Sequence, residues 1–112
     1  MKQGEIWLAD LNPPSGTEPG KIRPVVIVQS NLLNGFHPST IICPITTQVE
    51  PDTEILRIHL NDAINKLGKK SDVIVDQVRA IDNRRLLRRK GILSSKQLAQ
   101  LKTSLRIVMD LL

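Results

Sequence analysis

Short apolar runs, separated by turn-forming residues, dominate the first part of this chain and limit what it can fold into. Five such runs, rich in β-branched residues, occupy positions 4–10, 25–28, 39–45, 54–60 and 73–75. Runs of this length, bounded by Gly, Pro and Asn, are typical of strands. Five strands with short links predict a small β-barrel or a strongly bent sheet.

Single residues refine this prediction. The run 54–60 alternates, so Leu56 and Ile58 are expected on the buried face of a half-exposed strand. Pro44 has no backbone N–H and therefore predicts a strand end or a bulge. The run 73–75 continues towards Val78 with no Gly or Pro between them, so Asp76 and Gln77 are expected to be polar residues within a strand.

The C-terminal segment is expected to be a helix. Ser94 and Gln97 have the spacing of a capping box, and apolar residues then recur every three to four positions, at Leu98, Leu101, Leu105, Val108 and Leu112. One face of this helix should pack on the sheet. A chain of 112 residues is long enough for one modest core, so residues 1–112 are predicted to form a single, mainly β domain with a C-terminal helix.

Charge is distributed unevenly. The net charge is +5, and residues 61–112 hold twelve Lys and Arg against five Asp and Glu, whereas residues 1–60 hold four against six. This asymmetry favours a polyanion or an acidic protein as partner, although a basic surface without a partner is the alternative. The lone Cys43 excludes an internal disulfide and is expected to be buried. No apolar stretch predicts a leader or a membrane span, so a cytoplasmic location is expected.

Two polar segments next to apolar runs are candidates for chemistry. Residues 16–24 form a polar loop that leads Arg23 into a rigid strand, where its guanidinium could grip a phosphate at two points or simply pair with Glu18. At the end of the run 39–45, Thr46, Thr47 and Gln48 bring hydroxyls and an amide out of an apolar block. Such hydroxyls bind a ligand or close a turn.

Other polar groups give weaker indications. Asp76 and Arg79 could act on a substrate or form a structural salt bridge, and the basic run 83–90 could guide a phosphate backbone or be a solvated face. His37 and His59 are isolated in the sequence, and the acidic residues form no clustered ligand set. A zinc or two-metal nuclease is therefore not expected, and no cofactor is predicted.

In combination, these segments resemble the MazF/PemK family of toxins. The resemblance lies in Gly4-Glu5-Ile6-Trp7, Asp10-Leu11-Asn12-Pro13, Gly16-x-Glu18-x-Gly20-x-x-Arg23-Pro24 with the apolar run after it, Pro44-Ile45-Thr46, the segment 75–82, Arg85-Leu86 and Gly91-x-Leu93-Ser94. It covers essentially the whole chain. It implies an SH3-like β-barrel, assembled as a homodimer whose groove binds single-stranded RNA, and an acidic MazE-like antitoxin that occupies the same region. It also implies RNA cleavage without a metal, by attack of the ribose 2′-hydroxyl on the adjacent phosphate.

The resemblance assigns roles to individual residues. Arg23 and Thr46 match the catalytic pair of the family, and Asp76 matches an aspartate that is catalytic in one branch. Contacts to RNA are expected from six further residues: Thr17, Glu18, Lys21, Gln48, Gln77 and Arg79. The sequence departs from the family pattern in the loop, where Pro19 replaces a usual Gln and Thr17 stands where some members have His. It also has Ile74 where the Asp branch has an arginine, which favours the pair Arg23 and Thr46.

Two alternatives come from other functional classes. One is a toxin of the same fold that inhibits a protein target such as a topoisomerase, and the other is an RNA-binding module without activity. The presence of both Arg23 and Thr46 argues against the first, and neither residue is needed by the second.

Overall fold

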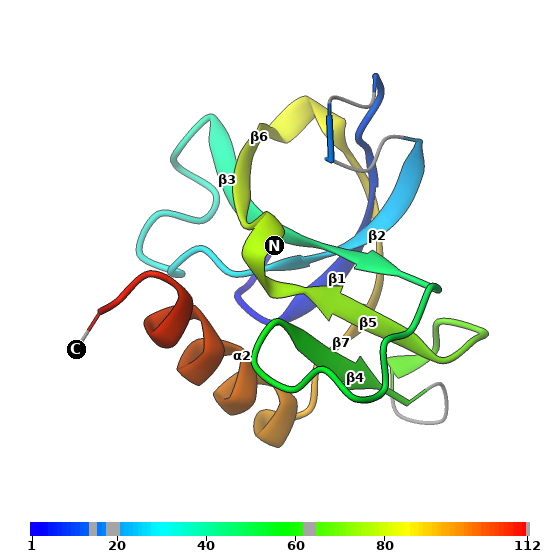
Figure 1. Cartoon of the computed structure of the whole chain (residues 1–112). Helices are drawn as coiled ribbons and strands as arrows, with labels where there is room; N and C mark the ends of the chain where they lie inside the picture. The colour runs from blue at the N-terminus through cyan, green and yellow to red at the C-terminus, as the bar shows by residue number, and fades with distance from the viewer. Residues whose placement is uncertain (14–15, 18–20, 62–64, 112) are drawn as a thin grey trace.

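The computed structural model describes residues 1–13, 16–17, 21–61 and 65–111. Within these ranges the chain forms a bent sheet with a helix packed against it (Figure 1). The elements are β1 (Glu5–Asp10), β2 (Ile22–Ile27), β3 (Ser39–Thr46), β4 (Arg57–Leu60), β5 (Ser71–Ile74), the 3₁₀ turn η1 (Val75–Gln77), β6 (Arg79–Asp82), the 3₁₀ turn η2 (Asn83–Arg85), β7 (Leu86–Ile92) and α2 (Ser95–Val108).

The strands are antiparallel and follow the order β4-β5-β3-β2-β1-β7, with β6 also paired to β3. Each face of the sheet carries a buried apolar cluster. The helix-side cluster contains Val26, Cys43, Ile45 and Leu101, and the second cluster contains Ala9, Val25, Ile27, Ile42 and Ile81. The prediction of a mainly β, SH3-like fold with a C-terminal helix is confirmed, although the ladder of described strands runs from β4 to β7 without closing.

Pro44 lies inside β3, so the prediction of a strand end or bulge at this position is wrong. The carbonyl of Ile41 accepts hydrogen bonds from Val28 and Gln29, which shows that Ile41 faces β2. Because neighbouring residues of a strand face opposite partners, Pro44 faces away from β2. On that side the partners of β3 change from β6, which ends its pairing at Ile42, to β5, which begins at Ile45. The missing N–H of Pro44 therefore costs no ladder hydrogen bond.

Two other strands are shorter than predicted. The alternating run 54–60 forms a strand only in β4, and Leu56 is 41% exposed where a buried position was expected. Its carbonyl accepts a hydrogen bond from the amide of Val75, one step beyond the Arg57–Ile74 pair, so contact with the neighbouring chain continues here although the regular strand has ended. Asp76 and Gln77 are not within a strand either, because the chain turns into η1 after β5.

The strand β7 was not predicted, since its basic sequence has no apolar alternation. It pairs with β1, and Glu5 of β1 ties the two strands by accepting from Arg89 Nε at 3.0 Å. Trp7 Nε1, on β1 itself, donates to the other oxygen of Glu5 at 3.2 Å. Gly91 of β7 lies so close to Asn65 that an added Cβ would sit 2.5 Å from the Asn65 carbonyl oxygen. This close approach explains the glycine at position 91.

The helix α2 begins where the capping box predicted. Ser94 Oγ accepts from the amide of Gln97, and Gln97 Oε1 accepts from the amide of Ser94. Leu101 is fully buried, and Leu98 and Leu105 pack against the same cluster, whereas Val108 is exposed and Leu112 lies outside the described residues. None of the described helices is long and apolar enough to cross a membrane.

Candidate functional site at the ends of β2 and β3

Arg23 enters β2 from the long loop that follows β1. It pairs with Ala9 of β1 and is partly buried. Since side chains alternate along a strand, Arg23 projects from the same face as Val25 and Ile27, which is the face opposite to α2. The packed strand therefore fixes the direction of the arginine side chain.

Thr46 is the next residue across the sheet from Arg23. The pairing of β2 with β3 runs through Val25 and Pro44, and two further steps in this register bring Arg23 opposite Thr46. Pro24 lies between Arg23 and Val25 in β2 and faces Ile45 of β3. Because it is a proline, it has no N–H to donate to Ile45. The hydrogen-bonded ladder of β2 and β3 therefore ends at this proline, and the two polar side chains follow on one face.

The strand end itself is a tight turn. Thr46 is 7% exposed, and its Oγ1 accepts a hydrogen bond from the amide of Gln48 at 3.1 Å. This bond is the turn-closing role that the sequence left open, and it leaves the hydroxyl proton of Thr46 able to donate. Thr47 and Gln48 are exposed, so only Thr46 of this segment is built into the sheet.

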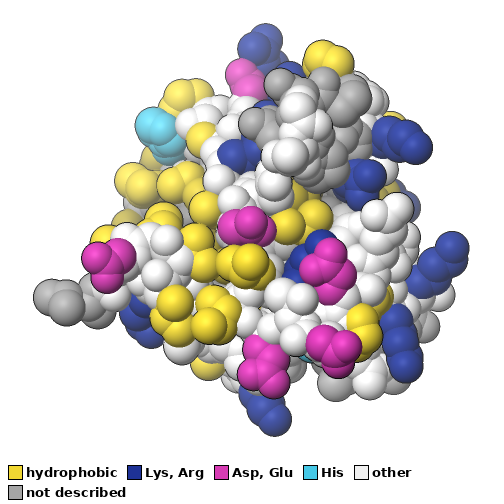
Figure 2. All heavy atoms as spheres, viewed as in Figure 1, with side chains coloured by type: hydrophobic (Ala, Val, Ile, Leu, Met, Phe, Trp, Pro, Cys, Tyr) yellow, Lys and Arg dark blue, Asp and Glu magenta, His cyan; other side chains and the backbone are white. Residues whose placement is uncertain are grey.

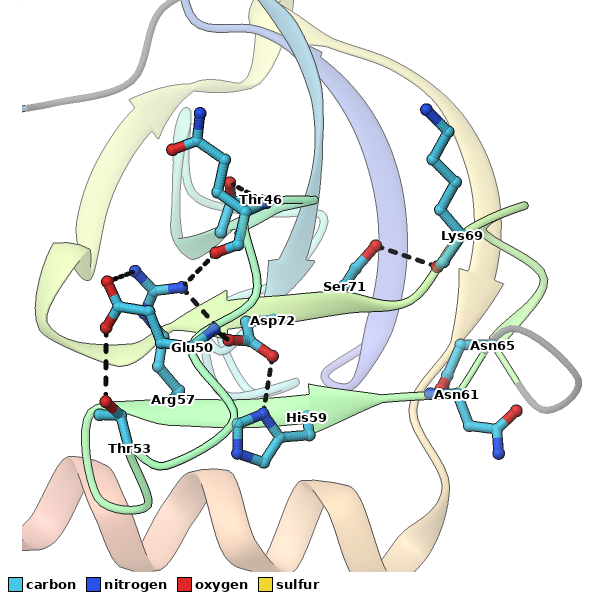
Figure 3. Close-up of polar contacts among 11 residues, drawn as sticks. Thr46, Glu50, Thr53, Arg57, His59, Asn61, Asn65, Lys69, Ser71 and Asp72 are labelled. Carbon is cyan, nitrogen blue, oxygen red and sulfur yellow. Dashed lines mark hydrogen bonds and ion pairs between the residues drawn. The ribbon is translucent and has the colours of Figure 1, made fainter.

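A buried carboxylate, which the sequence did not point to, holds this turn from below (Figure 3). Asp72 is the cross-strand partner of Thr46 and is 0% exposed. Its Oδ2 accepts from the amide of Glu50 at 2.8 Å and from Arg57 Nη1 at 3.2 Å, and its Oδ1 lies 2.7 Å from His59 Nδ1. His59, which is isolated in the sequence, is thus paired with Asp72 in the fold. Only the alternation of residues 54–60 could have placed Arg57 and His59 together.

The neck of the loop between β1 and β2 is closed by hydrogen bonds from the last residue of the 3₁₀ turn η2. Arg85 Nη1 donates to the carbonyls of Asp10 and Asn12 at 3.0 and 2.7 Å. Asn12 Oδ1 in turn accepts from the amide of Lys21 at 2.7 Å, and the Lys21 carbonyl accepts from the amide of Leu11. Lys21 and Thr17 are exposed, and Glu18 lies outside the described residues.

The candidates near β6 separate into two groups. Arg79 pairs with Ile42 and so projects from the face that carries Arg23 and Thr46. Asp76 is exposed in η1, which contacts α2 and β3, and its negative charge adds to the burial that raises the pKa of Cys43 to about 12. Cys43 belongs to the helix-side cluster, so Asp76 is associated with the other face. Gln77, which follows it in η1, is partly buried.

The surface is divided between apolar and basic regions. In Figure 2 hydrophobic side chains gather on the left of the face shown, over the loop between β2 and β3 and the end of α2. They include Leu32 and Phe36, which are 87% and 86% exposed. Of the Lys and Arg side chains visible in this view, most lie on the right and along the rim. Among the residues that the structure describes, no three His, Cys, Asp or Glu side chains gather as a metal site would require.

Comparisons with known proteins agree with this architecture. Residues 2–109 match the family model described as PemK-like, MazF-like toxin of type II toxin–antitoxin system. The chain is 32% identical over 111 residues to the Endoribonuclease MazF of Staphylococcus saprophyticus, covering 99% of this chain and 92% of that protein.

Solved structures show the same fold. The toxin MazF-mt6 of Mycobacterium tuberculosis has a TM-score of 0.80 at 27% identity, covering 96% of this chain and 97% of that one. MazF of Deinococcus radiodurans has a TM-score of 0.85 at 20% identity, over 99% of this chain and 97% of that one. A MazE-MazF complex from the same organism has a TM-score of 0.81 at 19% identity, over 100% and 98%. The chain therefore belongs to the family of PemK-like and MazF-like toxins of type II toxin–antitoxin systems.

Proposed function

We propose that this chain, an endoribonuclease toxin of the MazF and PemK family, cleaves single-stranded RNA within short sequence motifs and without a metal ion. The observation that carries the proposal is the register of β2 and β3: continued two steps past its last pair, Val25 and Pro44, it sets Arg23 opposite Thr46 on one face. The membership of the family and the relative named as an endoribonuclease support the reaction class. Residues 1–112 act as one catalytic domain in this proposal.

The proposed reaction is a transesterification. The ribose 2′-oxygen loses its proton and bonds to the adjacent phosphorus, and the bond from phosphorus to the 5′-oxygen breaks. The products are a 2′,3′-cyclic phosphate and a free 5′-hydroxyl. Negative charge builds up on the phosphorane oxygens, so a fixed cation at this position lowers the barrier.

Arg23 and Thr46 divide the work at the phosphate. Arg23 is too basic to be an efficient base, so it stabilises the developing charge through its planar, two-point grip and can donate a proton. Thr46 donates its hydroxyl proton to a phosphate oxygen. Exposed polar groups around them, Thr17, Lys21 and Gln48, contact the flanking nucleotides, together with Glu18, Gln77 and Arg79. Asp76 is the second catalytic candidate, and its place in η1 with the helix-side elements favours Arg23 and Thr46.

Two protein partners complete the proposal. A second copy of the chain forms a homodimer, and the large apolar side chains exposed on one surface, such as Leu32 and Phe36, support an association of this kind. An acidic MazE-like antitoxin covers Arg23, as the net charge of +5 and the MazE-MazF complex of a structural relative suggest.

The decisive experiment uses the purified protein and a long single-stranded RNA in excess EDTA. We expect cleavage at a short recurring motif, mapped by primer extension, with cyclic phosphate ends. Activity that returns only on adding a divalent ion contradicts the metal-free reaction. Binding of RNA without cleavage supports the inactive binding module, and no interaction with RNA supports a toxin directed at a protein target.

A further inference from the structure

We infer that Asp72 is a positioning residue for the proposed reaction: its buried carboxylate holds the turn that orients the hydroxyl of Thr46. The inference rests on the proposed function of Thr46. Asp72, Arg57 and His59 belong to no motif of the resemblance described above, and the family membership assigns them no role.

The contacts of Asp72 lead directly to the turn. Arg57 Nη1 donates both to Asp72 Oδ2, at 3.2 Å, and to the carbonyl of Gln48, at 3.0 Å. Asp72 Oδ2 also accepts from the amide of Glu50. The segment from Gln48 to Glu50 is thus held by Asp72 directly at Glu50 and through Arg57 at Gln48, and the Gln48 amide donates to Thr46 Oγ1 (Figure 3).

The same carboxylate is held on its other side. His59 is the cross-strand partner of Asp72 in β4, and its Nδ1 lies 2.7 Å from Asp72 Oδ1. Arg57 also pairs with Glu50 Oε1 at 3.2 Å. Because both of its oxygens accept hydrogen bonds, the carboxylate is held in one orientation. The backbone from Gln48 to Glu50, which is bonded to Asp72 and Arg57, is therefore held in one orientation as well.

The choice of a charge at this position is informative. Burying a carboxylate requires its desolvation to be balanced by pairing and hydrogen bonds, and a neutral pair often serves stability equally well. The fold contains such a neutral pair elsewhere, where Asn65 and Gln97 exchange two amide hydrogen bonds in the interior. That buried link is made of amides alone. The buried link at the end of β3 contains a carboxylate instead, whose two oxygens engage Arg57, His59 and the amide of Glu50.

The test compares Asp72→Asn with Gln97→Glu, two single-atom changes in buried pairs. We measure kcat and KM on one RNA at a temperature where both variants are folded, and the melting temperature of each. Asp72→Asn should lower kcat about 10- to 100-fold with little change in KM, because a small displacement at a reacting group is enough for such a loss. Gln97→Glu should lower the melting temperature and leave kcat unchanged.

Two further measurements separate positioning from general damage. The double variant Asp72→Asn with Thr46→Ala should be no slower than Thr46→Ala alone, since both changes remove the same oriented hydroxyl. The methyl NMR resonance of Thr46 should move in Asp72→Asn and stay in Gln97→Glu. If Asp72→Asn does not fold, Arg57→Lys serves instead, because it keeps the charge and loses the second donation to Gln48.

The outcomes are distinct. A normal kcat in Asp72→Asn, an equal loss in Gln97→Glu, or fully multiplicative effects with Thr46→Ala overturns the positioning role. Full activity of Thr46→Ala, or an inactive wild type, overturns the proposed function instead. In that case the Thr46 methyl resonance alone tests the inference. If Asp72→Asn leaves this resonance in place, Asp72 does not orient Thr46 and the inference is overturned too. If the resonance moves, Asp72 still orients Thr46.

Discussion

The two segments that carry the proposed catalytic pair are held in different ways. The turn after Thr46 is tied to Asp72, a charge with no exposure to solvent, from inside the sheet. The loop before Arg23 is closed at its neck by Arg85, which reaches from the end of η2 to two backbone carbonyls. One anchor is a buried carboxylate that holds a backbone amide, Arg57 and His59, and the other is a partly exposed guanidinium that holds two carbonyls.

This difference predicts which segment adapts to RNA. Hydrogen bonds at a solvated surface exchange readily with water, whereas those of a buried charge do not. We therefore expect Thr46 to be fixed before RNA binds, and the contacts of Arg85 at Asp10 and Asn12 to adjust when RNA binds.

The largest effect is expected for Arg23. Arg23→Ala removes the charge that stabilises the phosphorane, and the loss of one preorganised donor lowers the rate by about 10² to 10³. Arg23→Lys keeps the charge and loses the planar grip, so its activity should be intermediate. Single-turnover cleavage of a defined RNA measures both, and melting curves should show both variants folded. Near-normal cleavage by Arg23→Ala, with Asp76→Asn inactive, would instead assign the chemistry to Asp76.

Thr46 and Thr47 provide a comparison within one segment. Thr46→Ala should be severe, and Thr47→Ala should be mild, because Thr46 is built into β3 and Thr47 is exposed beyond its end. The measurement is kcat for each variant on the same RNA. Equal losses at the two positions would show that the turn, and not the hydroxyl of Thr46, is what matters.

Arg85→Ala tests the anchor of the other segment. It removes the donor of two backbone carbonyls, which water can replace, so we expect a loss of about tenfold in kcat/KM, equivalent to about 1.4 kcal/mol. The loss should fall mainly on KM, in contrast to Asp72→Asn, where it falls on kcat. Arg84→Ala is the control, since Arg84 pairs only with Asp82 at the surface in the contacts described here. The contrast between the two anchors disappears if both variants lose kcat.

The smallest effect is expected for Glu5, which ties β1 to β7. Burial alone would raise the pKa of Glu5, but hydrogen bonds from Trp7 and Lys2 and the charge of Arg89 lower it below its ordinary value of 4.5. A lowered pKa in the folded state gives stability that is present above 4.5 and is lost as the pH falls through the folded-state value. Glu5→Gln should therefore reduce stability at neutral pH by at most about 1 kcal/mol and flatten its decline in acid, as denaturant titrations would show. An unchanged acid profile would rule out this contribution.

Much of the fold could be predicted because its determinants are local. The apolar runs identify β1, β2 and β3, and the capping box at Ser94 identifies the start of α2. The strand β7 could not be found this way, because Arg88, Arg89 and Lys90 form a strand only through backbone pairing with β1. The turn η1 interrupts a run that propensity alone continues as a strand.

The residues of the candidate site also fall into those that the sequence indicates and those that only the fold brings together. Arg23 and Thr46 stand next to apolar strands, and family motifs point to them. Arg57 and His59 lie on β4 and Asp72 lies on β5, and the registers of β4 with β5 and of β5 with β3 bring the three residues together below Thr46. No spacing in the sequence encodes those registers, so a buried charge network of this kind becomes visible only in the structure.

The close approach of Gly91 to the Asn65 carbonyl has a consequence for genetics. Cells that express an unchecked toxin survive by acquiring mutations that inactivate it, and such selections are commonly read as maps of catalytic residues. Any side chain at position 91 meets backbone rather than a flexible side chain, so survivors should also carry substitutions here. Those survivors contain little folded toxin, whereas survivors altered at Arg23 contain a normal amount. Immunoblots of soluble extracts thus sort the two classes before any position is assigned to the chemistry.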